Sequence, residues 1–375
     1  MSERRTALNL TELEQRAIDS PINLSDGHPR QDPTGSQAKL ICRLPEFFEI
    51  AAVEPLAEIE RRAQAAFLGT LGQARAPLDS GRVFSVYSSS VATMAVANVL
   101  TGHRVALIHP TFDNIHDILV RQAAMIPMSE DACAEADLSQ ALAENATCVF
   151  VTTPNNPTGR VLDEPALRRL AEACAANCLL LCLDVSFRGF DLRAQFDHYA
   201  VLEDSGVDYV VIEDTGKLWP MQELKLGFVA VSESMRAEVE HALSDVLLAV
   251  SPFVLTLIEM LAVDAAQGGL AELHRLIAEN RRIVSDAVGG LDRVELLDPR
   301  SRISVGRLRF RSPADADRTR RGLYERGVHV LPCQQFHWAD QQEGAALLRV
   351  ALARNGATLA EGMRRLAAAH ASLAA

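Results

Sequence analysis

Four polar or charged positions stand out because each follows or interrupts an apolar run. Asp184 closes one run, Lys217 lies shortly after a second, Arg349 lies inside a third, and Asn155–Gly159 follows a fourth. A lysine at a strand end can form a covalent bond through its amine, and a buried arginine usually holds a carboxylate. A carboxylate that closes an apolar strand needs a partner or a cleft. Each position alone also has an ordinary explanation, such as a surface lysine, a turn or a structural ion pair.

The order of these positions along the chain matters more than any one of them. Upstream, the serines of Tyr87–Ser90 precede an expected helix at Val91–Leu100, and Phe112 follows an expected strand. A second cation, Lys225, follows Lys217. This order resembles the class I and II aminotransferases of fold type I over nearly the whole chain. The resemblance implies an α/β fold and pyridoxal 5′-phosphate as the cofactor.

The resemblance also implies a role for each position. Lys217 would carry the cofactor and move protons at the substrate Cα. Asp184 would pair with the pyridine nitrogen, since a nearby carboxylate favours the protonated ring. Asn156 would bond a ring oxygen and lie beside the substrate, and Arg349 would hold the substrate α-carboxylate. The positions implied for the cofactor are Ser89, Ser90, Phe112, Asn156, Asp184, Ser186, Lys217 and Lys225.

Among these, the two serines and Lys225 are assigned to the phosphate, because helix N-termini, hydroxyl groups and a cation suit a dianion. Phe112 would stack on the cofactor ring. Ser186 fits a plain turn serine equally well.

Two positions depart from the aminotransferase pattern. Ordinary members have a tyrosine where this chain has Phe187, and usually a serine where it has Asp214. The phenylalanine keeps the packing of the ring but loses the hydroxyl donor. A carboxylate at position 214 would repel a phosphate dianion, so we expect it to turn away from the phosphate site, with a cationic group of the substrate as its natural partner.

A narrower resemblance accommodates both departures. The sequence closely resembles the oxygen- and pyridoxal-phosphate-dependent arginine oxidases, a group that includes the enduracididine-type arginine hydroxylases. The matching stretches are Asn9–Thr11 with Glu14, Ile22–His28, Tyr87–Val91, His109–Ile115, Cys148–Leu162, Ser186–Phe190, Ile212–Pro220 and Gln335–Trp338.

In that group an N-terminal arm folds over the active site. The resemblance implies that Thr11, Glu14 and Asp214 contact the substrate side chain, and that Asp26 and His28 lie near the reacting carbons. His28 would join Lys217 as a catalytic residue, because the ordinary pKa of histidine suits proton transfer near neutral pH. Alternatively, Thr11 and Glu14 fit a capping box that opens a helix, and His28 fits a solvated loop histidine.

The activity implied is oxidation of L-arginine by dioxygen to 4-hydroxy-2-oxoarginine, with 2-oxoarginine as a by-product, in natural-product biosynthesis. A desaturase that gives a didehydro-2-oxo or imino arginine is an alternative. An ordinary aminotransferase, which needs an oxo-acid partner instead of oxygen, is another. A ligand sensor on this fold is disfavoured, since Met1–His28 is too short for a DNA-binding domain.

The elements that must position these residues alternate in type. Expected strands at Arg104–Ile108, Thr147–Thr152, Leu179–Asp184, Tyr209–Ile212 and Phe228–Val231 are separated by helical patterns such as Glu164–Ala176. This alternation predicts a mostly parallel sheet covered by helices, with the site beyond the carboxyl ends of the strands.

The pattern changes after about Val250. A long helical stretch at Pro252–Val288 leads to expected strands at Arg307–Phe310 and Leu347–Ala351 and a last helix at Thr358–Leu373. We therefore expect an arm at residues 1–40, a large cofactor-binding domain at 41–265 and a small α+β domain at 266–375.

Composition limits the partners. The formal charge of −12 disfavours nucleic acid and anionic membranes. No signal sequence or long apolar run is recognised, and the seven scattered cysteines have no zinc spacing. We expect a cytoplasmic protein with no metal and no membrane span, and a homodimer by analogy with fold-type-I enzymes.

Overall fold

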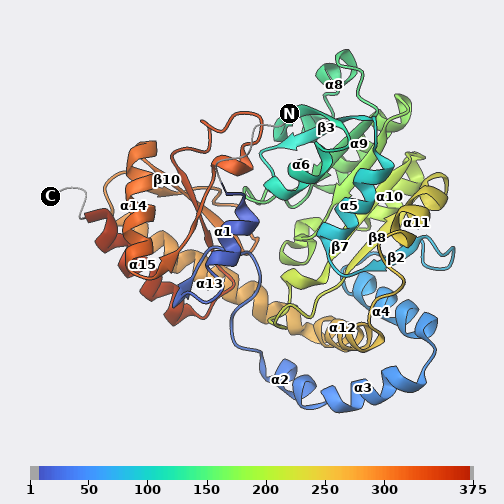
Figure 1. Ribbon diagram of the computed structural model, residues 1–375, viewed down its shortest axis with the longest axis horizontal. Coiled ribbons are helices and arrows are strands. Elements are labelled where there is room, and N and C mark those ends of the chain that lie inside the picture. Colours follow the sequence, from blue (N-terminus) through green and yellow to red (C-terminus); the bar gives the residue numbers. More distant parts are fainter. Residues whose placement is uncertain (1–7, 372–375) are drawn as a thin grey trace.

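The computed structural model describes residues 8–371, and its largest element is a sheet of seven strands (Figure 1). In spatial order the strands are β2 (Val83–Val86), β8 (Gly227–Val231), β7 (Tyr209–Asp214), β6 (Leu180–Asp184), β5 (Cys148–Thr152), β3 (Arg104–His109) and β4 (Ala124–Ser129). Within this sheet, β8 runs in the direction opposite to the other six strands. The expected mostly parallel sheet is confirmed, and β2 and β4 are strands that the sequence patterns did not indicate.

Both faces of this sheet are buried, which explains the nearly continuous apolar runs of its strands. In β5, Val149 and Val151 belong to one apolar cluster, whereas Cys148 and Phe150 belong to another. The first cluster lies under α4 (Leu56–Thr70), α9 (Glu164–Ala176), α10 (His198–Ser205) and α12 (Pro252–Asp264). The second lies under α5 (Ser89–Val99), α6 (Asp113–Leu119) and α11 (Arg236–Ser244).

The C-terminal part forms a second layer of sheet and helices. Its antiparallel sheet has the order β12 (Leu331–Pro332), β13 (Leu347–Ala351), β10 (Val305–Phe310) and β9 (Val294–Leu296). Its helices are α13 (Leu270–Gly289), α14 (Pro313–Glu325) and α15 (Gly356–Ala371). The expected α+β character is confirmed here, while the expected end of the last helix at Leu373 lies outside the described residues.

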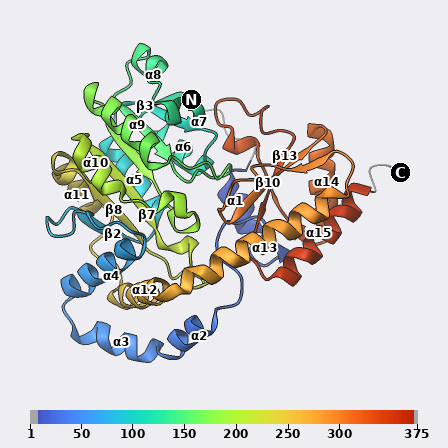
Figure 2. The ribbon, with the colours of Figure 1, turned by 180° about the vertical axis from the view of Figure 1, so that it is seen from behind.

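A kink separates the two parts of the long helical stretch. The segment Ala265–Gly269 contains non-helical backbone, with Gly268 at φ +104°. Before it, α12 packs on α4; after it, α13 packs on α15 (Figure 2). The kink coincides with the domain limit expected at residue 265, and the division into separate domains stays a prediction.

Contrary to expectation, this helical stretch is long and apolar enough to cross a membrane. Residues Pro252–Gly289 include an 18-residue window with a mean hydropathy of 1.5, half of which is buried. The apolar side chains of α12 that carry this hydropathy, such as Leu255, Leu257 and Leu261, are fully buried in the first cluster. The segment is therefore a core helix.

The N-terminal arm crosses from the C-terminal part to the large sheet (Figure 1). It contains α1 (Leu10–Arg16) and β1 (Ile22–Asn23), which pairs in parallel with β11 (Val328–His329). The chain then continues into α2 (Gly35–Cys42) and α3 (Leu44–Val53), so that α2 spans the expected arm limit at residue 40. Two short helices, α7 (Glu130–Glu135) and α8 (Ser139–Ala143), complete the fold.

The capping-box alternative for Thr11 and Glu14 is wrong. Asn9 is the N-cap of α1, and it exchanges hydrogen bonds with Glu12 in both directions. The box is therefore Asn9 with Glu12, two residues earlier, which leaves Thr11 and Glu14 free to face another part of the molecule.

Candidate active site

A cavity of about 210 Å³ lies where the arm meets the carboxyl ends of the central strands, as expected for an α/β sheet. It gathers most of the side chains expected from the sequence. Those that line it are Thr11, Glu14, His28, Ser89, Ser90, Phe112, Asn156, Asp184, Ser186, Asp214, Lys217, Lys225 and Arg349. Phe187, the first departure from the aminotransferase pattern, lines it as well.

Asp184, the last residue of β6, is buried, and within residues 8–371 no basic side chain is hydrogen-bonded to it. Its Oδ1 accepts from the amide of Ser186 at 2.9 Å and from the Ser186 hydroxyl at 2.5 Å. Burial raises the pKa of this carboxyl above its ordinary value, and the two hydrogen bonds only partly oppose the shift. A cationic group in the cavity would offset that desolvation.

Lys217 ends η3 (Thr215–Lys217), the turn that follows β7. Its Nζ lies 5.8 Å from the centre of the Phe187 ring and 3.2 Å from Nε2 of His28. Lys225 Nζ reaches the same His28 nitrogen at 3.0 Å. One imidazole from the arm therefore bridges two lysines of the large sheet.

These contacts fix the state of His28. Both lysines donate to Nε2, so the ring proton belongs on Nδ1. Nδ1 faces two carboxylates, Glu223 at 3.8 Å and Asp26 at 4.0 Å. Burial, followed by the charges of Lys217 and Lys225, places the pKa of His28 well below its ordinary value. The ring is therefore a neutral acceptor that protonates less readily than the sequence suggested.

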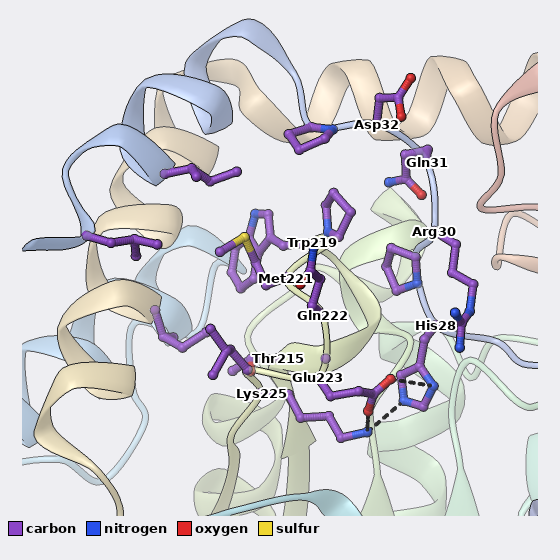
Figure 3. A pocket seen from close by; sticks show the side chains of 18 of the residues that line it. His28, Arg30, Gln31, Asp32, Thr215, Trp219, Met221, Gln222, Glu223 and Lys225 are labelled. Atoms are coloured by element: carbon purple, nitrogen blue, oxygen red, sulfur yellow. Dashed lines mark hydrogen bonds and ion pairs between the residues drawn. The ribbon is translucent and has the colours of Figure 1, made fainter. Parts of the chain in front are cut away.

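A second cavity, of about 610 Å³, shares His28 and Lys225 with the first (Figure 3). Glu223 extends from its wall to Lys225, with the ion pair at 2.5 Å. No sequence pattern pointed to Glu223, because it belongs to the loop between η3 and β8. Its backbone has φ +69°, a conformation uncommon for glutamate.

The start of α5 forms another wall. Ser88 caps this eleven-residue helix, and Ser89 and Ser90 turn their side chains to the cavity. Gly227 of β8 is tightly packed behind them, since a Cβ there would lie 3.0 to 3.1 Å from backbone atoms of Ser88 and Ser89. Close approach of β8 to the helix N-terminus thus requires glycine at this position.

Asp214 lies at this wall, in contact with Ser89. It accepts from the Ser89 hydroxyl at 2.8 Å and from the amide of Gly216 at 2.6 Å. The carboxylate therefore does not turn away from the serines, as its repulsion of phosphate had suggested. The negative charge of Asp214 therefore lies in the cavity wall, next to the first residue of α5.

Arg349 of β13 is almost fully buried at the opposite side. It donates to Glu14 of the arm at 2.8 Å, to Asn156 at 3.2 Å and to the carbonyl of Ser25. Its Nε is buried and has no hydrogen-bond partner among the described residues. The guanidinium thus keeps a donor available for a further acceptor such as a carboxylate.

Burial dominates the state of Glu14. It raises the pKa of this carboxyl above the ordinary value, and Arg349 and Lys217 oppose the shift. Thr11, one helical turn earlier, lines the same cavity. The arm helix therefore presents one hydroxyl and one carboxyl group to the site.

Asp26 is the one predicted site residue that the structure does not bring to the cavity wall. Its carboxylate accepts from Arg30 at 2.8 Å, from Asn23 at 2.9 Å and from Arg354 at 3.3 Å. Burial would raise the pKa of Asp26, but Arg354 and Arg30 reverse the shift and lower it. Asp26 thus holds the turn that carries His28.

Arg354 is a residue that sequence reasoning missed. This buried side chain donates to the carbonyls of Asn23, Asp26 and His28 at 2.6 to 2.8 Å. An arginine five residues after Arg349 in the same segment was the available signal, but its partners lie more than 300 residues away along the chain.

The sequence of the chain matches the family model described as aminotransferase class I and II over residues 22–366. The chain belongs to this family. Its family relatives include an aspartate aminotransferase of Thermococcus kodakarensis, which is 22% identical over 244 residues. The match covers 65% of this chain and 64% of that protein.

Among solved structures, the chain is similar to that described as MppP soaked with the product 2-ketoarginine. The two are 46% identical, the TM-score is 0.90, and the match covers 93% of this chain and 100% of the other. The α-aminoadipate aminotransferase LysN of Thermus thermophilus, complexed with N-(5′-phosphopyridoxyl)-L-leucine, shares the fold. It is 18% identical with a TM-score of 0.78, over 99% of this chain and 96% of the other.

Pyridoxal 5′-phosphate is therefore the cofactor, and the cavity has the groups that hold it. A buried carboxylate with a raised pKa, Asp184, suits the ring nitrogen. The N-terminus of α5, with Ser89, Ser90 and nearby Lys225, suits the phosphate. Lys217 lines the same cavity, and its amine suits covalent attachment of the cofactor.

Proposed function

We propose that this enzyme oxidises L-arginine with dioxygen and pyridoxal phosphate, giving 4-hydroxy-2-oxoarginine with 2-oxoarginine as a by-product. The observation that carries the proposal is the similarity to MppP, whose structure was solved with 2-ketoarginine as its product. That compound is arginine with a carbonyl in place of the amine-bearing Cα–H. At 46% identity over the whole of that chain, arginine is the best-supported substrate.

The charges of the cavity support a substrate with a cationic side chain. Glu14 and Asp214 both line it, and Thr11 adds a hydroxyl. Without substrate, Glu14 is paired with Arg349 at 2.8 Å. Arginine can replace that pair with two others, since its α-carboxylate suits Arg349 and its guanidinium suits Glu14. The exchange leaves no buried charge unpaired, which would otherwise cost several kcal/mol.

The bound cofactor supplies an electron sink for the carbon next to the substrate nitrogen. Lys217, at the end of η3, is the group that removes the proton from the substrate Cα. Asp184 keeps the proton on the ring nitrogen, as a carboxylate beside a cation does. Phe112 and Phe187 both line the cavity, and in this proposal their apolar rings exclude water from the reacting atoms.

The oxidation balances with oxygen as electron acceptor and water as oxygen donor. One arginine, one dioxygen and one water give 2-oxoarginine, ammonia and hydrogen peroxide. For the hydroxylated product, one arginine consumes two dioxygen and two water molecules and releases ammonia and two hydrogen peroxide. The C4 hydroxyl oxygen comes from water, and neutral His28 accepts the proton which that water loses.

An ordinary aminotransferase is the second candidate, favoured by the family match itself. Lys217, Asp184 and Arg349 would serve transamination equally well, and 2-oxoarginine would be its product too. Phe187 and Asp214, where aminotransferases usually have tyrosine and serine, favour the oxidase. A desaturase, which omits the addition of water, shares every residue except the role of His28.

Product analysis separates these candidates. Purified enzyme is incubated with arginine in air, under nitrogen, and under nitrogen with an added 2-oxo acid, while oxygen uptake and products are measured. The proposal expects oxygen uptake without oxo acid, peroxide formation and a hydroxylated oxo acid. Turnover that needs the oxo acid and consumes no oxygen would establish an aminotransferase. Oxygen uptake with only unsaturated product would establish a desaturase.

The proposal extends to the oligomeric state and the cellular location of the enzyme. We propose a homodimer, because fold-type-I sites are usually built across a dimer interface, and a cytoplasmic location in natural-product biosynthesis. All seven cysteines are unpaired, which agrees with a reducing compartment. Analytical ultracentrifugation at micromolar protein tests the dimer directly.

A further inference from the structure

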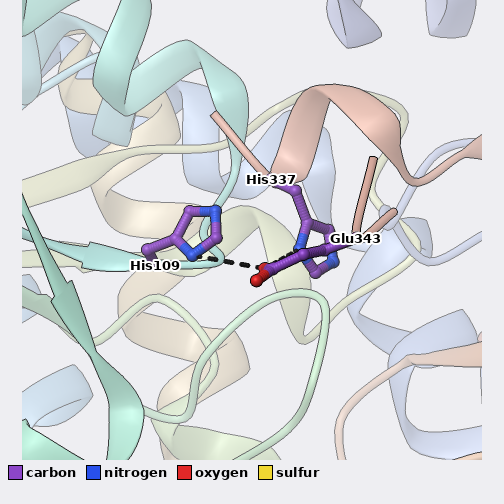
Figure 4. A group of neighbouring side chains, drawn as sticks. All are labelled: His109, His337 and Glu343. Atoms are coloured by element: carbon purple, nitrogen blue, oxygen red, sulfur yellow. Dashed lines mark hydrogen bonds and ion pairs between the residues drawn. The ribbon is translucent and has the colours of Figure 1, made fainter. Parts of the chain in front are cut away.

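Outside the active cavity, two histidines and a glutamate converge from the two parts of the molecule (Figure 4). His109 ends β3 of the large sheet, while His337 follows η6 (Gln334–Phe336) and Glu343 lies in the loop before β13. Oε2 of Glu343 lies 3.1 Å from Nδ1 of His337 and 3.8 Å from Nδ1 of His109. None of the three lines the active cavity.

The three groups form a ligand set that metals use. One ligand atom from each side chain lies within 4.8 Å of the other two. Two imidazoles with one carboxylate suit zinc and related divalent ions, which leave a fourth position for water. Metal binding requires a neutral imidazole. Both rings are mostly buried, which favours their uncharged form.

Charge and access also favour a cation. The two rings are mostly buried, whereas the side chain of Glu343 is 56% exposed, so an ion can enter from solvent. Asp340 adds negative charge near His109. The positive neighbour, Arg307, is already paired with Asp298 at 2.7 to 2.8 Å.

We propose that His109, His337 and Glu343 bind one divalent transition-metal ion of the zinc class. The ion ties the end of β3 to the loop that precedes β13. It has no part in the reaction, because the active cavity is lined by other residues.

The position of the site gives the ion a structural consequence. Beside it, the amide of Thr111 donates to the carbonyl of Phe336 at 3.1 Å, and the Trp338 indole donates to the carbonyl of Ile108 at 3.1 Å. Phe336 packs over Arg349, with 5.1 Å from the ring centre to the guanidinium carbon, and 5.8 Å from the Phe112 ring. An ion that joins His109 to His337 therefore braces the wall behind the substrate-carboxylate site.

The outer nitrogens of the two rings set the expected strength of binding. Nε2 of both histidines is buried and has no hydrogen-bond partner among the described residues. Metal-bound histidines usually donate that N–H to a carboxylate or carbonyl, and loss of such partners weakens binding by about 10–100-fold. We therefore expect binding about 10–100-fold weaker than at a zinc site whose histidines have such partners.

The test is calorimetric titration of ZnCl₂ into the cofactor-loaded enzyme, prepared without an affinity tag and treated with a chelator. We expect one saturable site per chain. Glu343→Gln should weaken the site by at least about tenfold, and His337→Gln should abolish it. Because Glu343 is exposed, E343Q should fold normally. Matched controls are E295Q, an exposed glutamate on β9, and H241Q, an exposed histidine on α11, which should bind zinc as the wild type does.

Thermal denaturation gives a second measurement. An ion that binds only the folded state raises the melting temperature, so zinc should raise it in the wild type, E295Q and H241Q but not in E343Q. The absence of saturable binding in the wild type would overturn the proposal. Equal binding and equal stabilisation in E343Q and H337Q would overturn it as well, since the zinc would then lie elsewhere.

Discussion

The sheet side and the arm side of the active cavity are anchored in different ways. On the sheet side, Asp184 and Asp214 are the last residues of adjacent parallel strands that are buried on both faces. On the arm side, Thr11 and Glu14 belong to a seven-residue helix, and His28 belongs to a turn after a two-residue strand. The two aspartates are positioned by their strands, whereas the arm is held by side chains of the C-terminal part.

Two arginines of the C-terminal part, Arg349 and Arg354, bind the arm through hydrogen bonds. Arg349 binds Glu14 and the Ser25 carbonyl, and Arg354 binds three further arm carbonyls. In the proposed function most cofactor residues lie at the sheet, whereas Thr11, Glu14 and His28 of the arm serve the substrate, so cofactor binding and substrate selectivity should respond separately to substitution.

Removing the amine on the sheet side should have the largest effect. Lys217→Ala should lower turnover by at least about 10⁴-fold, because both covalent attachment of the cofactor and proton transfer at Cα depend on it. The visible absorbance of the lysine-bound cofactor should disappear. The matched control is Lys39→Ala, an exposed lysine of α2, which should leave both unchanged. Full activity of Lys217→Ala would remove the main assignment.

Releasing the arm should impair stability and selectivity but not cofactor attachment. Arg354→Gln removes a buried cation from Asp26 and should lower the free energy of unfolding by about 3–5 kcal/mol. Urea denaturation measures that loss. In the folded variant the cofactor absorbance should persist, while the KM for arginine rises. Arg354→Lys keeps the charge without the planar fork and should fall between the two. Unchanged stability and KM would show that the arm is held by other contacts.

Asp214 tests whether a sheet residue can serve the substrate. Asp214→Ser should weaken arginine binding by about 3–5 kcal/mol, as for a buried carboxylate that loses its guanidinium partner, and cofactor binding much less. Glu14→Gln is the corresponding variant on the arm side. Titrations of arginine and of pyridoxal phosphate into each variant measure the two affinities. A fall in cofactor affinity alone for Asp214→Ser would assign this residue to the phosphate.

His28 should control the product and leave the oxidation intact. His28→Ala should still consume oxygen, but the products should shift from the hydroxylated oxo acid to the plain or unsaturated one. Mass spectrometry in ¹⁸O-labelled water measures this, with label expected in the C4 hydroxyl of the wild-type product. The control is His241→Ala, which replaces an exposed histidine of α11. If the His28 variant makes as much hydroxylated product as the wild type, His28 has no role in adding water.

We expect pH to have the smallest effect, and only on the fraction of product that is hydroxylated. The pKa of His28 is lowered well below 6.5 by burial and two lysines, so the ring is neutral at every pH above that value. The hydroxylated fraction should therefore stay constant from about pH 8 to pH 6.5 and fall only in more acid solution, as the ring becomes protonated. A titration of this fraction centred between these values would mean that substrate binding restores an ordinary histidine pKa.

Much of the sheet side could be predicted because it depends on local patterns. Expected strands at Leu179–Asp184 and Tyr209–Ile212 differ from β6 and β7 by two residues or fewer at each end, since buried parallel strands require unbroken apolar runs. The strand β4 was missed because its apolar residues alternate with exposed ones, from Ala124 to Ser129, and include a proline. The strand β2 is only four residues long.

The arm was harder to predict for a physical reason. A capping box at Thr11 and Glu14 and one at Asn9 and Glu12 both satisfy the local rules, and only the backbone of α1 distinguishes them. Asp26 was placed near the substrate, but its carboxylate is occupied by Arg30 and Arg354. A buried charge pairs with the opposite charges that the fold brings near it, and one of these, Arg354, lies 328 residues away along the chain.

The family, the cofactor and most of the residues that line the active cavity could be predicted from the amino-acid sequence. These depend on short motifs that follow strands, and parallel strands bring their carboxyl ends to one edge regardless of the loops between them. Tertiary structure alone decided which charges are paired, which tautomer His28 adopts, and that His109, His337 and Glu343 meet. Those outcomes depend on contacts between distant segments, whose geometry no local spacing encodes.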